Sequence, residues 1–168
     1  VKAVIDIGGQ DSKVISVGEH GKVIDFAMND KCAAGSGRFL EVMAGAMEVK
    51  LEDMGRLSLQ SSHRTDISST CTVFAESEVI THVAAGIPRV DIIAGIHYSI
   101  ATRVAGLFLS RIRGKLKSGD IVMTGGVAQN IGVVKALEEK LGCEIIVPPD
   151  PQFIGARGAA LIAKEQFS

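Results

Sequence analysis

The sequence predicts an α/β fold with a mixed sheet and elements in the order β-β-β-α-β-α-β-α. Three observations predict it. Short β-branched segments fill the first 27 residues, the middle of the chain has helical periodicity, and the last third alternates strand-like and helix-like segments. Strands joined by tight turns pair antiparallel, whereas strands joined through helices pair parallel. The 168 residues suit one domain or two small lobes with a real core.

The N-terminal segment is typical of an antiparallel meander of three strands. Residues 1–7 form an apolar run that ends in a pair of glycines, and residues 13–17 form a second run. Residues 18–21 have the composition of a turn, and residues 22–27 alternate apolar and polar side chains.

Helices are expected through the middle of the chain. Residues 38–47 place apolar side chains on one helical face, and residues 51–64 suggest a short helix followed by a loop. A helix over 73–85 would stop at Gly86. A long helix over 88–113 would follow, with a proline at its first position.

The last third repeats a strand–helix pattern. Strands are expected over 120–124 and 144–147, separated by a helix over 129–141 for which Gly142 is a suitable C-terminal cap. A closing helix built on small residues is expected over 154–166.

Composition excludes several classes of protein. With 46% hydrophobic and 22% charged residues, intrinsic disorder is disfavoured. A net charge of −1 offers no global attraction for nucleic acid or an anionic membrane, so neither is expected as a partner. No uninterrupted apolar run approaches the roughly 18 residues of a membrane span. Three cysteines are too few for a disulfide framework, which favours a cytoplasmic protein with reduced thiols.

The first of three glycine turns follows the first strand. Gly8 and Gly9 come directly after a strand that carries Asp6 near its end. Glycines let backbone N–H groups approach phosphate oxygens closely, and a neighbouring aspartate can hold Mg2+ through water or orient an attacking water. The alternative is an ordinary hairpin with a surface aspartate, because diglycine hairpins are common.

The other two glycine turns each precede a helix. Gly125 and Gly126 connect a strand to a helix, a geometry that suits an anion or a nucleotide, although many plain connections also contain glycines. The stretch that begins with Gly155 and Ala156 opens the last helix, where small residues also permit close helix packing. A G-x-x-x-x-G-K-[ST] loop and a G-x-G-x-x-G strand–helix motif are both missing, which disfavours P-loop and Rossmann nucleotide sites.

Cys32 and Cys71 each lie in a polar or small-residue loop just before a predicted helix. A helix N-terminus lowers the pKa of a thiol, so two such thiolates could ligate a metal or a cluster. Two ligands per chain would be completed to four by a symmetric dimer. The alternative is a pair of ordinary thiols, and Cys143 has the setting of a small core residue.

Four segments resemble the activator component of 2-hydroxyacyl-CoA dehydratases, a family that includes the ATPase subunits of benzoyl-CoA reductase. They cover residues 6–13, 29–39, 68–78 and 123–130. The two cysteine segments are the specific ones. The glycine segments alone would indicate only the wider ATPase fold of actin, heat-shock chaperones and sugar kinases.

The resemblance implies a homodimer with one [4Fe–4S] cluster held by Cys32 and Cys71 of each subunit. It implies ATP or ADP with Mg2+, an electron donor such as ferredoxin or flavodoxin, and a dehydratase or reductase that receives the electron. Nucleotide-driven movement of the two helices beside the cluster is the coupling that the family implies.

The resemblance also distributes the nucleotide contacts over the glycine turns. Phosphate and Mg2+ would face Asp6 and Gln10 as catalytic residues, together with Gly8 and Gly9. The remaining nucleotide contacts would come from Gly125, Gly126, Val127, Gly155 and Ala156.

One feature of the family has no counterpart in this sequence. Family members begin with another strand hairpin that carries a first phosphate loop, and residue 1 stands where their second lobe starts. We therefore expect residues 1–168 to be a C-terminal lobe with an incomplete ATP site. Two other functions stay open: a small-molecule kinase of the same fold without a cluster, and a non-enzymatic lobe for redox sensing or dimerisation.

Overall fold

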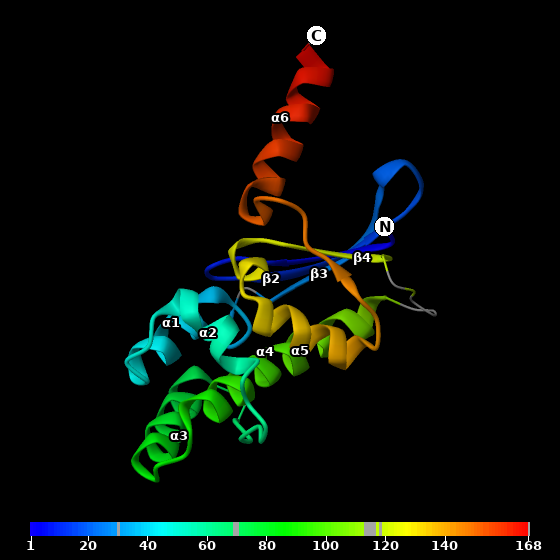
Figure 1. The fold of residues 1–168 in the computed structure, drawn as a ribbon. Coiled ribbons are helices and arrows are strands. Elements are labelled where there is room, and N and C mark those ends of the chain that lie inside the picture. Colours follow the sequence, from blue (N-terminus) through cyan, green and yellow to red (C-terminus); the bar gives the residue numbers. More distant parts are fainter. Residues whose placement is uncertain (30, 69–70, 113–116, 118, 168) are drawn as a thin grey trace.

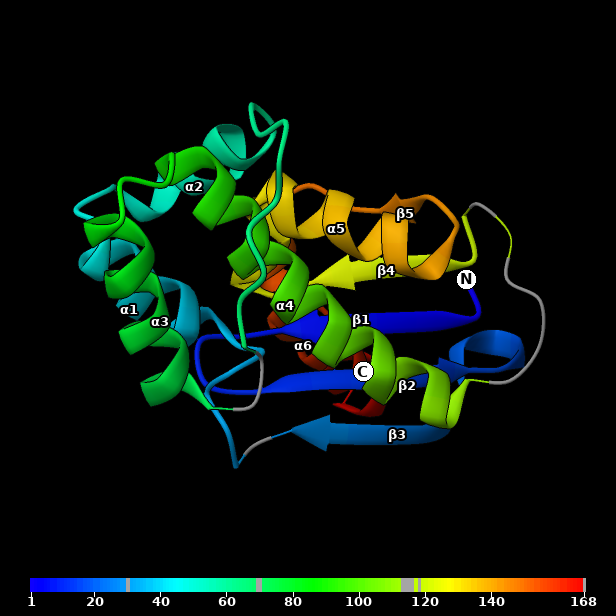
Figure 2. The same cartoon turned by 90° about the horizontal axis from the view of Figure 1, so that it is seen from below.

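A computed structural model describes residues 1–29, 31–68, 71–112, 117 and 119–167. In this part of the chain five strands form one mixed sheet (Figure 1), in the order β3-β2-β1-β4-β5 (Figure 2). Strands β1, β2 and β3 pair antiparallel, while β4 pairs parallel with both β1 and β5. The strands are β1 (Ala3–Ile7), β2 (Ser12–Val17), β3 (Val23–Asn29), β4 (Ile121–Thr124) and β5 (Ile145–Ile146). The predicted meander and the predicted mixed sheet are confirmed.

The helices follow the predicted order closely. They are α1 (Gly37–Ala46), α2 (Leu51–Ser58), α3 (Thr72–Ala84), α4 (Arg89–Arg111), α5 (Ile131–Leu141) and α6 (Ile154–Phe167). The described residues also contain short 3-10 turns. η1 (Glu19–Gly21) lies between β2 and β3, while η2 (Gly126–Gln129) and η3 (Pro151–Phe153) connect strands to α5 and α6. The predicted end of the long helix at residue 113 lies outside the described residues.

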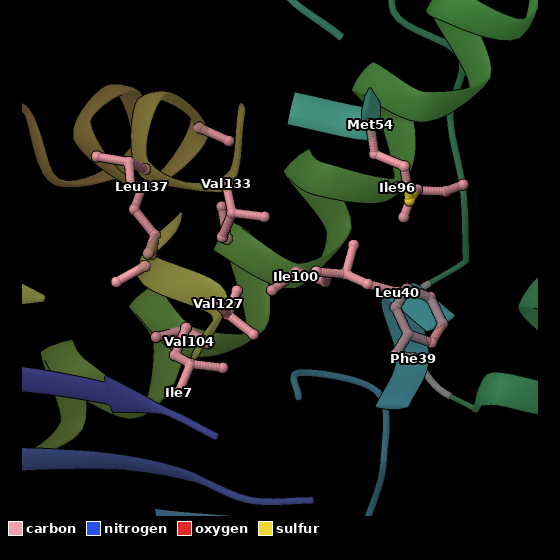
Figure 3. Packing of buried hydrophobic residues seen from close by; sticks show 14 of the residues in the cluster. Ile7, Phe39, Leu40, Met54, Ile96, Ile100, Val104, Val127, Val133 and Leu137 are labelled. Atoms are coloured by element: carbon pink, nitrogen blue, oxygen red, sulfur yellow. The ribbon is translucent and has the colours of Figure 1, made fainter. Parts of the chain in front are cut away.

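One face of the sheet carries the core, and α4 and α5 cover it (Figure 2). Alternate strand residues such as Ile5, Ile7 and Met123 are fully buried against Ile100 and Val104 of α4. Figure 3 shows side chains of α4, α5 and β1 meeting in this cluster. Helix α4 is long and apolar enough to cross a membrane by length and composition, but 61% of its most apolar window is buried here. Its apolar composition is therefore that of a central core helix.

The opposite face of the sheet is also apolar. Because β-strand side chains alternate between faces, the strand pairing sets one residue from each strand in a single row. The row runs Phe26, Ile15, Val4, Val122, Ile146. Its central members are half-buried and its two ends are exposed. Helix α6 starts beyond β5, has no buried residue and extends away from the sheet (Figure 1).

Candidate functional site

A cavity of about 410 Å3 opens where two of the three glycine turns meet. Its walls come from β1–β2, α1, α2 and the segment between β4 and α5. The lining residues are Gly8, Gly9, Gly37, Leu40, Glu41, Leu51, Glu52, Gly126, Val127, Gln129 and Asn130. Four residues that the sequence predicts as nucleotide contacts therefore line one cavity. Gly8 and Gly9 lie more than 100 positions before Gly126 and Val127 in the sequence.

The Gly8–Gly9 turn is held against the start of α1. The Gly37 N–H donates to the Gly8 carbonyl (2.8 Å), and the Arg38 N–H donates to the Gly9 carbonyl (2.7 Å). A Cβ at position 37 would come within 3.4 Å of both glycines and of Val127, so Gly37 permits this close approach. Two backbone hydrogen bonds thus join the first glycine turn directly to the helix that follows Cys32.

Gly125 does not line the cavity but shapes the second turn. Its φ of +85° is rarely adopted by residues with a side chain. A Cβ there would also overlap the Ile7 carbonyl of the neighbouring strand. Its N–H donates to the Pro151 carbonyl at 3.0 Å. Glycine at this position lets the segment leave β4 beside β1 and pass over the cavity.

Asp6 and Gln10 lie next to this cavity rather than among its lining residues. The Asp6 carboxylate accepts from the Thr124 hydroxyl (2.7 Å) and lies 3.8 Å from the Lys13 ammonium. Lys13 also pairs with Asp11 at 2.6 Å. Asp6 is a third exposed and Gln10 is exposed. The carboxylate is therefore fixed at the carboxyl end of β1, where water can reach it.

Gly155 and Ala156 begin α6 and are also not among the lining residues. A Cβ at position 155 would meet no atom within 4 Å, so the close helix packing considered above is not found there. The third glycine stretch is thus not brought to the cavity within the described residues.

Sequence reasoning missed the side of the cavity that is formed by helices. Leu40, Leu51 and Val127 give it apolar surface, while Glu41 and Glu52 place carboxylates at its edge. Asn130 could have been found, because an asparagine just before an apolar helical run is a strong N-cap signal. Its Oδ1 accepts from the N–H groups of Gly132 (3.0 Å) and Val133 (3.2 Å). No pattern in the sequence places α2 beside the glycine turns.

A buried polar contact lies behind Asn130. Its Nδ2 is 3.2 Å from Nε2 of His97, a residue of α4 that is only 1% exposed. Burial lowers the pKa of His97 from 6.5 to about 3, so the imidazole is neutral near pH 7. A Cβ at Gly132 would overlap both the imidazole and the Ser58 hydroxyl. Three helices, α2, α4 and α5, therefore meet here in close contact.

The two candidate ligand cysteines lie near the starts of helices that pack against each other. Cys71 is the N-cap residue of α3, and Cys32 lies five positions before the first residue of α1. Figure 2 shows α1 and α3 side by side. Both thiols are free and half-buried. The Cys32 carbonyl accepts from Asn29 Nδ2 at 3.0 Å. Residues 69 and 70 of the second cysteine segment lie outside the described residues.

No group of three or more Cys, His, Asp or Glu side chains suited to a metal ion occurs among the described residues. The surface beside Cys71 is apolar, since Val73 is 65% and Phe74 is 68% exposed. Cys143 instead packs against the core cluster, and burial is the main cause that raises the pKa of its thiol. Its predicted role as a small packing residue is consistent with this setting.

The cavity has the chemistry of a nucleotide site. Glycine backbone at one side can approach phosphate oxygens, and apolar side chains beside carboxylates can accept a base and a ribose diol. The two thiols near neighbouring helix starts fit half of a four-thiolate cluster, and a second copy of the chain would have to supply the other half.

Comparison with known proteins identifies related chains. Over 97% of its length the chain is 60% identical to the (R)-2-hydroxyglutaryl-CoA dehydratase activating ATPase of Acidaminococcus fermentans, covering 61% of that protein. It is 53% identical over 98% of its length to the activator of lactoyl-CoA dehydratase of Anaerotignum propionicum, covering 62% of it. The chain thus spans about 60% of the length of these curated relatives.

Solved structures give the same result. The activator of the 2-hydroxyisocaproyl-CoA dehydratase from Clostridium difficile, with bound ADPNP, matches with a TM-score of 0.92 and 50% identity, covering 99% of this chain and 60% of that one. A more distant protein, the ethanolamine utilization protein EutJ from Carboxydothermus hydrogenoformans, matches at 19% identity with a TM-score of 0.55, covering 95% of this chain and 48% of that one, which supports the fold alone. The fold is that of the actin and heat-shock-chaperone ATPases. Since the family pattern also matches residues 1–163, the chain belongs to the BadF/BadG/BcrA/BcrD ATPase family.

Proposed function

We propose that this chain is the nucleotide-binding and cluster-binding part of an ATP-dependent activator that passes an electron to a 2-hydroxyacyl-CoA dehydratase or an aryl-CoA reductase. The observation that carries the proposal is the joining of two features in one framework. The first glycine turn lines the cavity, and its carbonyls accept hydrogen bonds from Gly37 and Arg38 at the start of the helix that follows Cys32.

ATP or ADP is proposed to occupy the cavity. The phosphates would approach Gly8 and Gly9, and the adenosine would lie over Gly126 and Val127, with Leu40 and Leu51 offering apolar contact. The cavity supports this orientation because the backbone of the first turn is free of side chains while the helical side is apolar. A relative with bound ADPNP supports the ligand class.

Mg2+ is proposed to lie beside Asp6. The carboxylate is fixed by Thr124 and half-neutralised by Lys13, which favours contact with the ion through water over a direct bond. Gln10 is exposed on the same turn and could orient the attacking water. Both residues would act from the rim of the cavity.

A [4Fe–4S] cluster is proposed to be shared by two copies of the chain. Cys32 and Cys71 would supply two thiolate ligands, and Cys71 stands at the N-terminus of α3. The bound cluster would provide one-electron chemistry at low potential. The exposed Val73 and Phe74 give the homodimer an apolar surface beside the thiols. A ferredoxin or flavodoxin would be the electron donor, in the cytoplasm.

The test is iron and nucleotide binding on protein purified without oxygen. We expect about four irons for two chains, a broad absorption near ~400 nm and a dimer in solution. Cys32→Ser and Cys71→Ser should each abolish iron binding and keep the affinity for ADP. Cys143→Ser is the matched control and should keep the iron.

Iron-free monomers with tight ADP binding would contradict the cluster and favour the cluster-free kinase. Bound iron without any affinity for ADP or ADPNP would contradict the nucleotide site and favour a redox lobe.

A further inference from the structure

His97 is a buried polar residue that the proposed chemistry does not use. It lies in the middle of α4, away from both cysteines in sequence, and its side chain is not among those that line the cavity. Only Asn130 separates the ring from the proposed nucleotide cavity. Its side chain contacts His97, and the same residue lines the cavity.

The hydrogen bonds of Asn130 fix which atoms face each other. Its Oδ1 accepts from two backbone N–H groups at the start of α5, at 3.0 and 3.2 Å. The amide Nδ2 must then point at His97, and an amide nitrogen can only donate. Nε2 of His97 is therefore the acceptor at 3.2 Å, and the ring proton is carried by Nδ1.

The surroundings leave this pair little freedom. Gly132 has no room for a Cβ against the imidazole, and a Cβ at Gly55 would meet Asn130 Oδ1 at 2.9 Å. Helices α2 and α5 thus press on the pair from both sides. The Nδ1 atom is buried without a partner among the described residues. Packing and one hydrogen bond, to Asn130, therefore hold the ring in place.

We propose that His97 is a positioning residue for the nucleotide cavity, because its neutral ring accepts from Asn130 and so holds the side chain and backbone of residues 126–130 against the ligand. The inference rests on the proposed nucleotide site. It extends that site to α4, the helix that follows the one bearing Cys71. Without the acceptor, the Asn130 Nδ2 would lose its partner on α4, and the segment of residues 126–130 would be held less firmly on the cavity wall.

Calorimetric titration with ADP tests this role. We expect His97→Leu, which removes the acceptor, to weaken ADP binding roughly fivefold to tenfold. His97→Gln keeps an oxygen acceptor of similar reach and should restore affinity to within about twofold of the unaltered protein. Ile100→Val is the control for altered packing on the same helix. It should lower thermal stability and leave the ADP affinity unchanged.

A double-substitution cycle separates positioning from general loosening. Asn130→Ser keeps a side-chain oxygen that can cap α5 and loses the amide from which His97 accepts. His97→Leu should then have no further effect on ADP affinity in the Asn130→Ser background. Nitrogen-15 NMR of the unaltered protein should show the Nδ1–H form of His97 at pH 7, a readout that does not depend on nucleotide.

The outcomes distinguish the two proposals. If the unaltered protein does not bind ADP, the proposed function fails and this inference fails with it. If it binds ADP, but His97→Leu binds equally well or the two substitutions add, only the positioning role is overturned. An Nε2–H form in the NMR spectrum would overturn it as well.

Discussion

The region around the cavity and the region around Cys32 and Cys71 differ in how far the chain itself satisfies their contacts. Around the cavity, close contacts depend on glycines, and the polar atoms of Asn130 are matched within the chain. Around Cys32 and Cys71, thiols are half-buried, and Val73 and Phe74 point to solvent. The first region is closed by the chain's own packing, whereas the second presents groups suited to further contacts. Substitutions should therefore affect folding at the first and assembly at the second.

The largest effect is expected at the second glycine turn. Gly125→Ala should lower the free energy of unfolding by about 3 kcal/mol or more, because the new Cβ meets the Ile7 carbonyl at a φ of +85°. Gly126→Ala is the matched control, since a Cβ there meets nothing within 4 Å. Urea unfolding of both variants measures the difference. Equal stability of the two would show that the turn relaxes and makes room for a side chain beside the Ile7 carbonyl.

The next effect is a pH dependence that arises at His97. Its pKa is about 3 in the folded chain and 6.5 when exposed, so the unfolded state binds the extra proton first. This contribution to stability is complete above pH 6.5 and is lost as the pH falls toward 3. Between pH 7 and 5 it amounts to about 2 kcal/mol.

The His97→Leu variant has no titrating group at this position. Between pH 7 and pH 5 its free energy of unfolding should therefore fall by about 2 kcal/mol less than that of the unaltered protein. Urea unfolding at the two pH values checks this. Parallel pH profiles for the variant and the unaltered protein would mean that the buried ring is not a source of acid sensitivity.

A smaller effect on folding, with a larger one on assembly, is expected beside Cys71. Phe74→Ser removes a side chain that is 68% exposed and should change the free energy of unfolding by less than about 0.5 kcal/mol. The proposed dimer, prepared without oxygen, should dissociate into monomers at a higher protein concentration than that of the unaltered protein. Ser77→Ala, one turn further along α3, is the control, and sedimentation gives both masses. An unchanged dimer would place the contact between copies elsewhere.

Much of the fold could be predicted because its elements have local signals. The helix expected over 38–47 is α1 at 37–46, and the turn glycines stand where predicted. The helix expected over 129–141 starts two residues later, as α5, because Asn130 caps it with its side chain, and Gln129 is instead the last residue of η2. The strand expected over 144–147 shortens to the two residues that pair with β4.

Only the part of the candidate site that is formed by turn glycines could be predicted from the sequence. Gly8 and Gly126 meet because parallel pairing of β1 and β4 aligns their carboxyl ends. Leu51 and Glu52 reach the cavity through the packing of α2 on α4 and α5, a long-range contact that no local pattern encodes. His97 has an apolar helical setting in the sequence, and its bond to Asn130 depends on tertiary structure alone.

The apolar row on the open face of the sheet has a consequence for colloidal behaviour. Phe26 and Ile146 are the two ends of an apolar row that crosses all the described strands, and an exposed apolar row favours association in water. Two molecules could associate through this row without a metal. Self-association that persists in air and without iron would come from this row, whereas association that disappears on oxidation reports on the thiols.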